Sequence, residues 1–206
     1  SQAFIVSSDS NKICQYFVDK KVYIDFDKLN PYITDFTKLN KEIFSYIMDN
    51  VNFSMKTSFL RCIDKAILNK NLDVIEYLFE KNAKSDNALN IAVNGHNIDV
   101  VNIVLKYNSK PYFINKVKSN GTALFNAVVN EDLPIVERLL SIPNIDPSSY
   151  NEHFEFPLIA AIKNYNLEIV NAIINFYGEN IQYQEEQLNE AIKTVFTFYS
   201  SGLYER

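Results

Sequence analysis

The stretch from Thr122 to Leu140, TALFNAVVNEDLPIVERLL, organises the interpretation of the whole chain. It predicts two short helices joined by a polar turn, with small and apolar residues in the first half and apolar pairs at helical spacing in the second. Isolated helices shorter than roughly 12–15 residues are marginal in water. The stretch must therefore pack against similar elements, and the chain contains near copies of it on both sides.

Four gapless segments share one pattern, and they span residues 61–79, 87–105, 122–140 and 156–174. Each has an aliphatic residue at its third position and an alanine at its sixth, the alanines being Ala66, Ala92, Ala127 and Ala161. Each also has a tetrad at the turn between its two helices: Asn71-Leu-Asp-Val, Asn97-Ile-Asp-Val, Asp132-Leu-Pro-Ile and Asn166-Leu-Glu-Ile. Self-similarity of this kind predicts a repeat architecture.

The tetrad predicts where the second helix of each copy begins. Asn or Asp is a favoured N-cap because its side-chain oxygen accepts an orphan backbone N–H. An acidic residue in the first turn suits the positive end of the helix dipole. Pro134 lies in that first turn in the third copy, where its missing N–H is harmless. Each copy is therefore expected to begin its second helix at the same point.

The pattern resembles the ankyrin repeat, whose unit is a β-turn followed by two antiparallel helices with a T-P-L-H-x-A opening. The closest matches to that opening are Thr122-Ala-Leu-Phe-Asn-Ala and Phe156-Pro-Leu-Ile-Ala-Ala, and the resemblance covers residues 61–178. It implies an all-α fold, an ankyrin-type α-solenoid of stacked helix-turn-helix repeats with short or irregular β-turn fingers. The main structural alternative is a tetratricopeptide array, which expects Trp markers that this chain lacks.

The chain departs from the ankyrin pattern at its glycines. The Gly-His that separates the two helices in that family is replaced by Lys70-Asn71, His96-Asn97, Glu131-Asp132 and Tyr165-Asn166. The Gly-Ala after the second helix survives once, as Asn82-Ala83. Because asparagine tolerates the left-handed conformation better than most residues, we expect it to keep these turns feasible.

We expect a single ankyrin-repeat domain over residues 1–206. Its predicted parts are degenerate N-terminal repeats or a cap at 1–57, repeats at 58–84, 85–111, 120–145 and 154–178, and a C-terminal capping half-repeat at 179–206. Projecting turns are expected at about 112–121, where Asn120-Gly121 is a hairpin signal, and at about 146–155. Asn40-Lys-Glu-Ile repeats the cap pattern near the N-terminus, and the aromatic segment 194–206 is expected to fold back as a cap or to mark a truncation.

Composition and charge argue against several functions. The net charge of −5 disfavours general nucleic-acid binding, which needs a clustered cationic footprint. No apolar run approaches the roughly 18 residues of a membrane span, and the first residues lack the features of a signal peptide. Cys14 and Cys62 are far apart and lack metal spacing, which suggests two reduced thiols in the cytoplasm. We therefore expect a cytoplasmic protein without metal or cofactor.

Catalytic patterns are not recognisable in the sequence. It contains no His-Glu-x-x-His, no Cys-x-x-Cys and no glycine-rich phosphate loop. Of the two histidines, His96 falls in a turn between helices and is expected to be solvated, whereas His153 falls in a finger beside aromatic residues. The acidic cluster Glu185, Glu186 and Glu190 is most simply a solvent-facing helix start. These observations favour a non-enzymatic protein.

The ankyrin resemblance implies a protein–protein interaction scaffold that binds a partner protein on its concave face, as a monomer and with no small-molecule substrate. The predicted partner contacts follow the marker alanines or occupy the fingers: Asn69, Asn94, Tyr112, Lys118, Asn120, Asn130, Tyr150, Asn151, His153 and Lys163. Phe113 and Phe154 also lie in the fingers, but we expect them to pin these loops to the core.

Two other functions stay open. The chain begins with Ser1 rather than Met, which suggests a regulatory or targeting module of a larger enzyme or of a pathogen effector. A hydrolase with an unrecognised site is the third alternative, and turnover of generic ester or phosphate substrates would support it.

Overall fold

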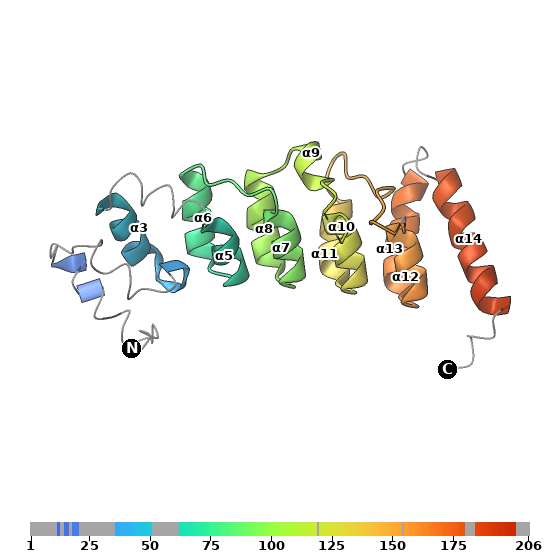
Figure 1. The fold of residues 1–206 in the computed structure, drawn as a ribbon, viewed down its shortest axis with the longest axis horizontal. Helices are drawn as coiled ribbons and strands as arrows, with labels where there is room; N and C mark the ends of the chain where they lie inside the picture. Colours follow the sequence, from blue (N-terminus) through green and yellow to red (C-terminus); the bar gives the residue numbers. More distant parts are fainter. Residues whose placement is uncertain are drawn as a thin grey trace. The chain divides into compact units, whose positions relative to one another are not determined.

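The computed structural model describes residues 12, 15–16, 18–20, 36–50, 62–118, 120–153, 155–179 and 184–200. The chain folds into short helices in sequential pairs (Figure 1). The elements are η1 (Phe36–Lys38), α3 (Lys41–Asn50), α5 (Ile63–Leu68), α6 (Leu72–Glu80), α7 (Ala88–Asn94), α8 (Ile98–Tyr107), α9 (Pro111–Ile114), α10 (Ala123–Val129), α11 (Leu133–Leu140), α12 (Pro157–Lys163), α13 (Leu167–Glu179) and α14 (Gln184–Ser200).

The four predicted repeats correspond to four helix pairs: α5 with α6, α7 with α8, α10 with α11 and α12 with α13. In every pair the marker alanine is fully or almost fully buried. The only β-structure in the described ranges is an isolated bridge between Lys118 and Gly121. The expected all-α fold of helix-turn-helix repeats is therefore confirmed. No helix in these ranges is long and apolar enough to cross a membrane.

The chain divides into two compact units. The first consists of residues up to Gly95 together with Asn102–Tyr107, and the second of His96–Val101 together with the residues from Asn108 onward. In the first unit, η1 packs on α5, α3 packs on α6, and α5 also contacts α6 and α7. The Phe44 and Tyr77 rings meet edge to face with centroids 5.8 Å apart, and Lys106 binds Glu76 at 2.6 Å.

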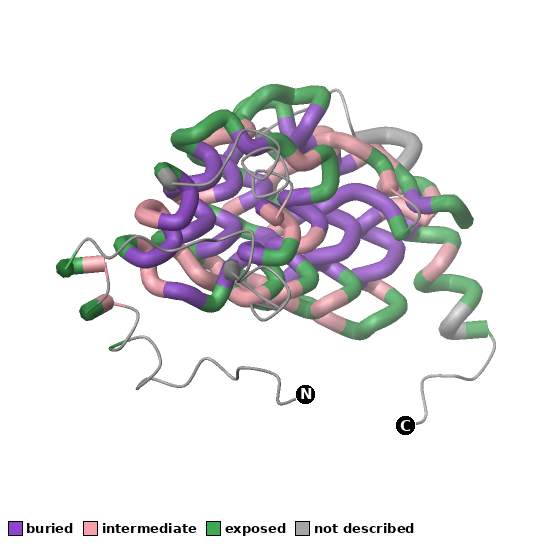
Figure 2. Tube along the Cα trace, turned by 60° about the vertical axis from the view of Figure 1, so that its left-hand side comes forward, coloured by how far each residue is buried: buried purple, intermediate pink, exposed green. Residues whose placement is uncertain are grey.

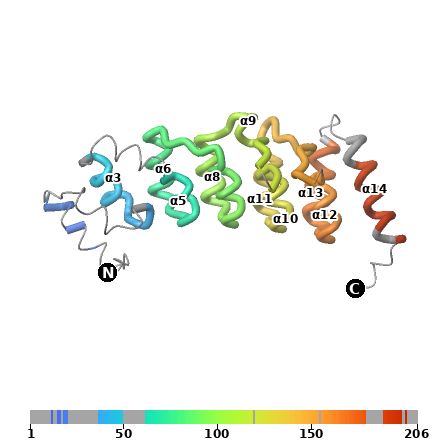
Figure 3. Tube along the Cα trace, in the orientation of Figure 1, coloured from blue at the N-terminus to red at the C-terminus, as the bar shows by residue number. Residues whose placement is uncertain are grey.

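The second unit contains the best-preserved repeats. Helix α10 packs against α11 and α12, α11 packs against α13, and α12 packs against α13 and α14. Figure 3 follows this order along the chain from the yellow α10 to the red α14. The residues that hold these helices together are fully buried and aliphatic: Leu124, Ile135, Leu139, Leu158 and Ile169. Figure 2 shows the buried core in purple and exposed residues, including much of α14, in green.

The predicted helix caps are present. Each cap side chain accepts a hydrogen bond from the backbone N–H three residues later, at 3.4, 3.0, 3.3 and 3.1 Å for Asn71, Asn97, Asp132 and Asn166 respectively. Asn40 caps α3 in the same way, with a distance of 2.8 Å to the N–H of Ile43. The degenerate copy of the cap pattern near the N-terminus is therefore confirmed as the start of a helix.

The left-handed residue of each turn is not the one that the sequence suggested. We expected asparagine to take this conformation, but the residue before the cap takes it: φ is 56° at Lys70, 51° at His96, 57° at Glu131 and 56° at Tyr165. The cap residue cannot be left-handed because it must be extended enough to begin the next helix. At Asn82, where φ is 64°, asparagine replaces the family's glycine as expected, and Asn144 in the loop after α11 is also left-handed, with φ of 64°.

Backbone hydrogen bonds explain why the left-handed residue is needed. The N–H groups of Asn71, Asp132 and Asn166 donate to the carbonyl oxygens of the marker residues Ala66, Ala127 and Ala161, at 3.3, 3.1 and 3.1 Å. This six-to-one bond around a left-handed residue is the Schellman motif that ends the first helix. One short turn thus ends the first helix and caps the second.

Two predicted features differ from the structure. The projecting turn expected at about 112–121 begins as a helix, α9, in which Phe113 and Ile114 are buried. Pro111 starts this helix because its fixed φ suits the first helical position. The segment after Ala191 does not fold back within residues 194–200, because α14 continues through it.

Candidate partner-binding site

A cavity of about 390 Å³ lies in the second unit, between the loop that follows α11, helix α12 and helix α14. Its wall combines aromatic, aliphatic and charged side chains. They are Tyr150, His153, Glu155, Phe156, Ile159, Lys163, Glu190 and Thr194. We refer to these eight residues as the loop cavity.

The loop that forms one side of the cavity is held in shape by its own polar groups. The carboxylate of Asp146 accepts hydrogen bonds from the N–H of Ser148 at 2.9 Å and from the hydroxyl of Ser149 at 2.8 Å. Asn115 lies directly after α9 and contacts this loop through its side-chain amide. Its Oδ1 accepts a hydrogen bond from the N–H of Asp146 at 2.9 Å, and its Nδ2 donates one to the carbonyl of Asn144 at 2.8 Å. The two fingers of this unit therefore brace each other.

Asn151 stabilises the tip of the same loop. Its Oδ1 accepts hydrogen bonds from the backbone N–H groups of His153 at 2.9 Å and Glu155 at 3.0 Å, and its own N–H donates to the carbonyl of Glu155 at 3.1 Å. Asn151 as a whole is 8% exposed. Asn151 therefore fixes the positions of His153 and Glu155.

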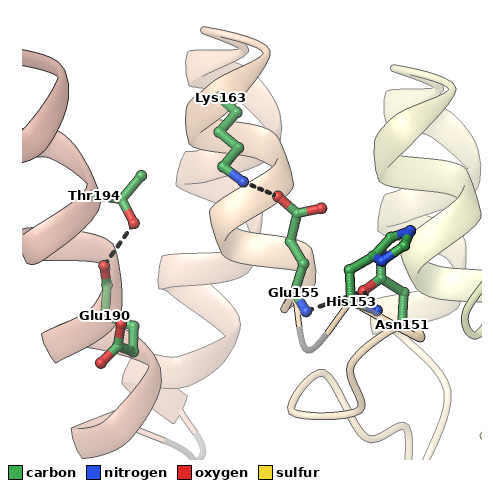
Figure 4. Close-up of polar contacts among 6 residues, drawn as sticks. All are labelled: Asn151, His153, Glu155, Lys163, Glu190 and Thr194. Atoms are coloured by element: carbon green, nitrogen blue, oxygen red, sulfur yellow. Dashed lines mark hydrogen bonds and ion pairs between the residues drawn. The ribbon is translucent and has the colours of Figure 1, made fainter.

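Charges of both signs line the loop cavity (Figure 4). Lys163, the last residue of α12, extends to Glu155 with Nζ 2.5 Å from Oε1. Across the cavity on α14, Glu190 pairs with Lys193 at 2.6 Å, and the hydroxyl of Thr194 donates to the carbonyl of Glu190 at 2.8 Å. The lysine and glutamate side chains are partly exposed, so they can exchange their present partners for groups on a bound molecule.

The aromatic side of the cavity is partly open. The Tyr150 ring meets Phe156 edge to face with centroids 6.0 Å apart, and among the lining residues Tyr150 is exposed whereas Ile159 is buried. A mixed wall of this kind suits an apolar side chain with a polar end. In the described ranges no group of three or more His, Cys, Asp or Glu side chains could hold a metal ion.

The structure brings some of the predicted contact residues together and separates others. Tyr150, His153 and Lys163 line the loop cavity, and Asn151 braces it. Tyr112, Lys118, Asn120 and Asn130 belong to the same unit but do not line this cavity. Asn94 is exposed at the end of α7 in the first unit. Asn69, in the first unit, donates to the hydroxyl of the buried Thr37 at 2.7 Å, and it is only partly exposed.

Phe113 is buried, as we expected of a residue that pins its loop. Phe154 and Cys14 lie outside the described residues.

The sequence did not indicate five of the residues that line the cavity, namely Glu155, Phe156, Ile159, Glu190 and Thr194. Glu190, which the sequence places in a solvent-facing helix start, lines the loop cavity and is also 45% exposed. The four-residue spacing from Glu190 to Thr194, together with the alignment of Ala191 to Ala161, could have indicated that both lie on one face.

The comparison with protein families agrees with this geometry. Residues 63–151 match the family model of ankyrin repeats, in three copies. This segment therefore belongs to the ankyrin repeat family, and its helix pairs are ankyrin repeats. The match contains the helix pairs α5–α6, α7–α8 and α10–α11. A comparison with curated proteins found no match.

Proposed function

We propose that this protein is a non-enzymatic interaction module that binds a partner protein at the loop cavity. Ankyrin repeats are generally protein–protein interaction modules, and repeat arrays present extended surfaces for this purpose. The observation that carries the proposal is the cavity of about 390 Å³ in which three residues predicted from the repeat pattern, Tyr150, His153 and Lys163, lie together.

The chemistry of the loop cavity supports this role. Binding energy in protein interfaces is concentrated in a few residues, among which tyrosine is enriched. Tyr150 is exposed yet oriented by its contact with Phe156, so little conformational freedom would be lost when it binds. Truncating such an anchor typically costs about 2 kcal/mol of binding free energy. Glu155, Glu190 and Lys163 would select among partners through their charges, and His153 through its ring N–H group and nitrogen acceptor.

Affinity purification coupled to mass spectrometry tests the proposal. The unmodified chain, the variant Tyr150→Ala/His153→Ala and a control variant Asn171→Ala are used as baits. Asn171 is exposed on α13 and does not line the cavity. We expect the partner to be recovered by the unmodified chain and the control, and to fall roughly thirtyfold with the double variant, as about 2 kcal/mol implies.

Equal recovery of the partner by all three baits would refute the loop cavity as the binding site. Circular dichroism melting curves of the baits separate loss of contact from loss of fold, because both substituted side chains are exposed. The cytoplasmic location, the monomeric state and the single-domain organisation stay predictions from the sequence.

A further inference from the structure

A second concave surface lies at the end of the second unit and is almost entirely apolar. It is a groove of about 530 Å³ between α12, α13 and α14, on the side of α14 away from the loop cavity. Helix α13 contributes Leu167, Val170 and Ile174, and α14 contributes Leu188, Ile192, Val195 and Phe196. We call the surface formed by these seven residues the end groove.

The repeat supplies an internal control for this surface, because α11 carries the same pattern as α13 shifted by 34 residues. Val136 and Leu140 of α11 are 0% and 8% exposed. The equivalent Val170 is only half-buried, and Ile174 is 42% exposed. Leu167 is 73% exposed. Positions that one repeat buries are thus uncovered in the next, although their side chains are equally apolar.

The order of the helices shows what is missing. Helix α14 packs on α12 as α12 packs on α10, and its Ala191 is buried like the marker alanines. It therefore holds the place of a first helix. Helices α10 and α12 each have a second helix packed beside them, namely α11 and α13. In the part of the chain that the structure describes, no second helix accompanies α14, and the end groove is the place such a helix would fill.

We propose that the end groove binds an amphipathic α-helix of a partner protein, one that carries the apolar pattern of this chain's own second helices. In that pattern apolar residues stand at i, i+1, i+4 and i+5, as do Ile135, Val136, Leu139 and Leu140 of α11. Recognition of one helix by a hydrophobic groove between two others is an established mode of peptide binding. The bound helix continues the row that α11 and α13 begin.

Two physical arguments support a single helix as the occupant. Four large apolar side chains of this surface are exposed, namely Leu167, Ile174, Ile192 and Phe196. Contiguous exposed apolar surface of this kind marks an interaction site. A second copy of the chain that bound through the same surface would place two grooves face to face, and neither groove would be filled. One helix of about 10 Å diameter matches the space between packed helices.

This proposal does not depend on the loop cavity. Glu190 and Thr194 face that cavity, whereas Leu188, Ile192 and Val195 face the end groove, so α14 separates the two sites. Substitutions at one site can therefore be made without changing the side chains of the other.

The probe is a synthetic peptide with the sequence of residues 131–145, EDLPIVERLLSIPNI, which contains α11 and its own N-cap. It is titrated into the full chain labelled with ¹⁵N, and amide chemical shifts are recorded. We expect saturable shifts confined to α13 and α14, with a dissociation constant below about 1 mM. A control peptide with Ile135→Glu and Leu139→Glu should bind at least tenfold more weakly.

Two variants of the chain locate the binding. Ile192→Glu places a charge in the groove and should weaken peptide binding at least tenfold, or about 1.4 kcal/mol. Asn189→Glu adds the same charge to an exposed position of the same helix outside the groove, and should change the affinity less than twofold. Both positions are exposed, so neither variant is expected to unfold the chain.

Three outcomes would overturn the proposal. The first is the absence of shifts in α13 and α14 at about 1 mM peptide. The second is binding that Ile192→Glu leaves unchanged. The third is a dimer of the unmodified chain in sedimentation equilibrium that Ile192→Glu converts to a monomer, which would make a second copy the occupant of the groove.

Discussion

Helices α11 and α13 carry the same apolar pattern in consecutive repeats, and yet they contribute differently to the molecule. Helix α11 packs against α10 on one side and α13 on another, so its apolar face is closed. Helix α13 packs against α11 and α12, and its remaining apolar face lines the end groove. The pattern in the sequence determines which face is apolar, whereas the neighbouring element determines whether that face is buried in the fold or stays exposed.

The largest effect is expected when the equivalent residues Leu140 and Ile174 are each replaced by alanine. Leu140→Ala removes a buried side chain and should lower the free energy of unfolding by about 3 kcal/mol. Ile174→Ala removes a partly exposed side chain and should cost about 1 kcal/mol or less, because much of its surface is already in water. Urea unfolding followed by circular dichroism measures both values.

The matched pair Leu139→Ala and Ile173→Ala serves as the control. Both side chains are completely buried, so both substitutions should be strongly destabilising, by roughly 2–5 kcal/mol. Equal costs for Leu140→Ala and Ile174→Ala would show that the exposed face of α13 is covered in solution, which would contradict the comparison.

The closed side of α13 gives the second prediction. The Tyr177 hydroxyl lies 3.5 Å from the carbonyl oxygen of Pro147 in the loop, and its ring is almost completely buried. Burial raises the pKa of the Tyr177 phenol far above its ordinary value, and the negative charge of Asp146 raises that pKa further. As pH rises past about 10, the unfolded chain loses this proton while the folded chain keeps it, so the free energy of unfolding should fall by up to about 1.4 kcal/mol per pH unit.

Unfolding titrations of the unmodified chain and of Tyr177→Phe between about pH 7 and 11 check this effect. The free energy of unfolding should depend on pH in the same way for both proteins below about pH 9. Above about pH 9 it should fall less steeply for Tyr177→Phe than for the unmodified chain. Burial, Asp49 and Glu80 also raise the pKa of Tyr77, so Tyr77→Phe should remove a further part of the alkaline decline. Identical alkaline profiles for the unmodified chain and both variants would rule out buried phenols as its cause.

The sequence predicts the repeats and their caps because both depend on local chemistry. A cap needs only an asparagine or aspartate three residues before an orphan N–H, and the five caps from Asn40 to Asn166 are formed as that rule requires. The marker alanines are equally predictable, since their small side chains recur at a fixed place in each copy. The fold could therefore be derived from residues 61–178 without any structure.

The candidate sites could be predicted only in part, because they depend on which elements become neighbours. Tyr150 and Lys163 were identified from their places in the repeat, but Glu190 and Thr194 join them only because α14 packs on α12. The end groove has no signal in the sequence of any single helix. It exists because α13 and α14 bear apolar residues that no described second helix covers.

The smallest effect concerns the turn that precedes each second helix. Glu131 is exposed and has φ of 57°, a conformation that costs a residue with a side chain roughly 1–2 kcal/mol and costs glycine nothing. Glycine loses more chain entropy on folding, by roughly 0.5–1 kcal/mol, so Glu131→Gly should stabilise the protein by a net ~0.5–1 kcal/mol. The neighbouring Asn130 has φ of −76°, so Asn130→Gly should instead destabilise by a similar amount. Thermal unfolding should therefore shift in opposite directions for these two adjacent substitutions, and shifts of the same sign would mean that backbone strain does not govern this turn.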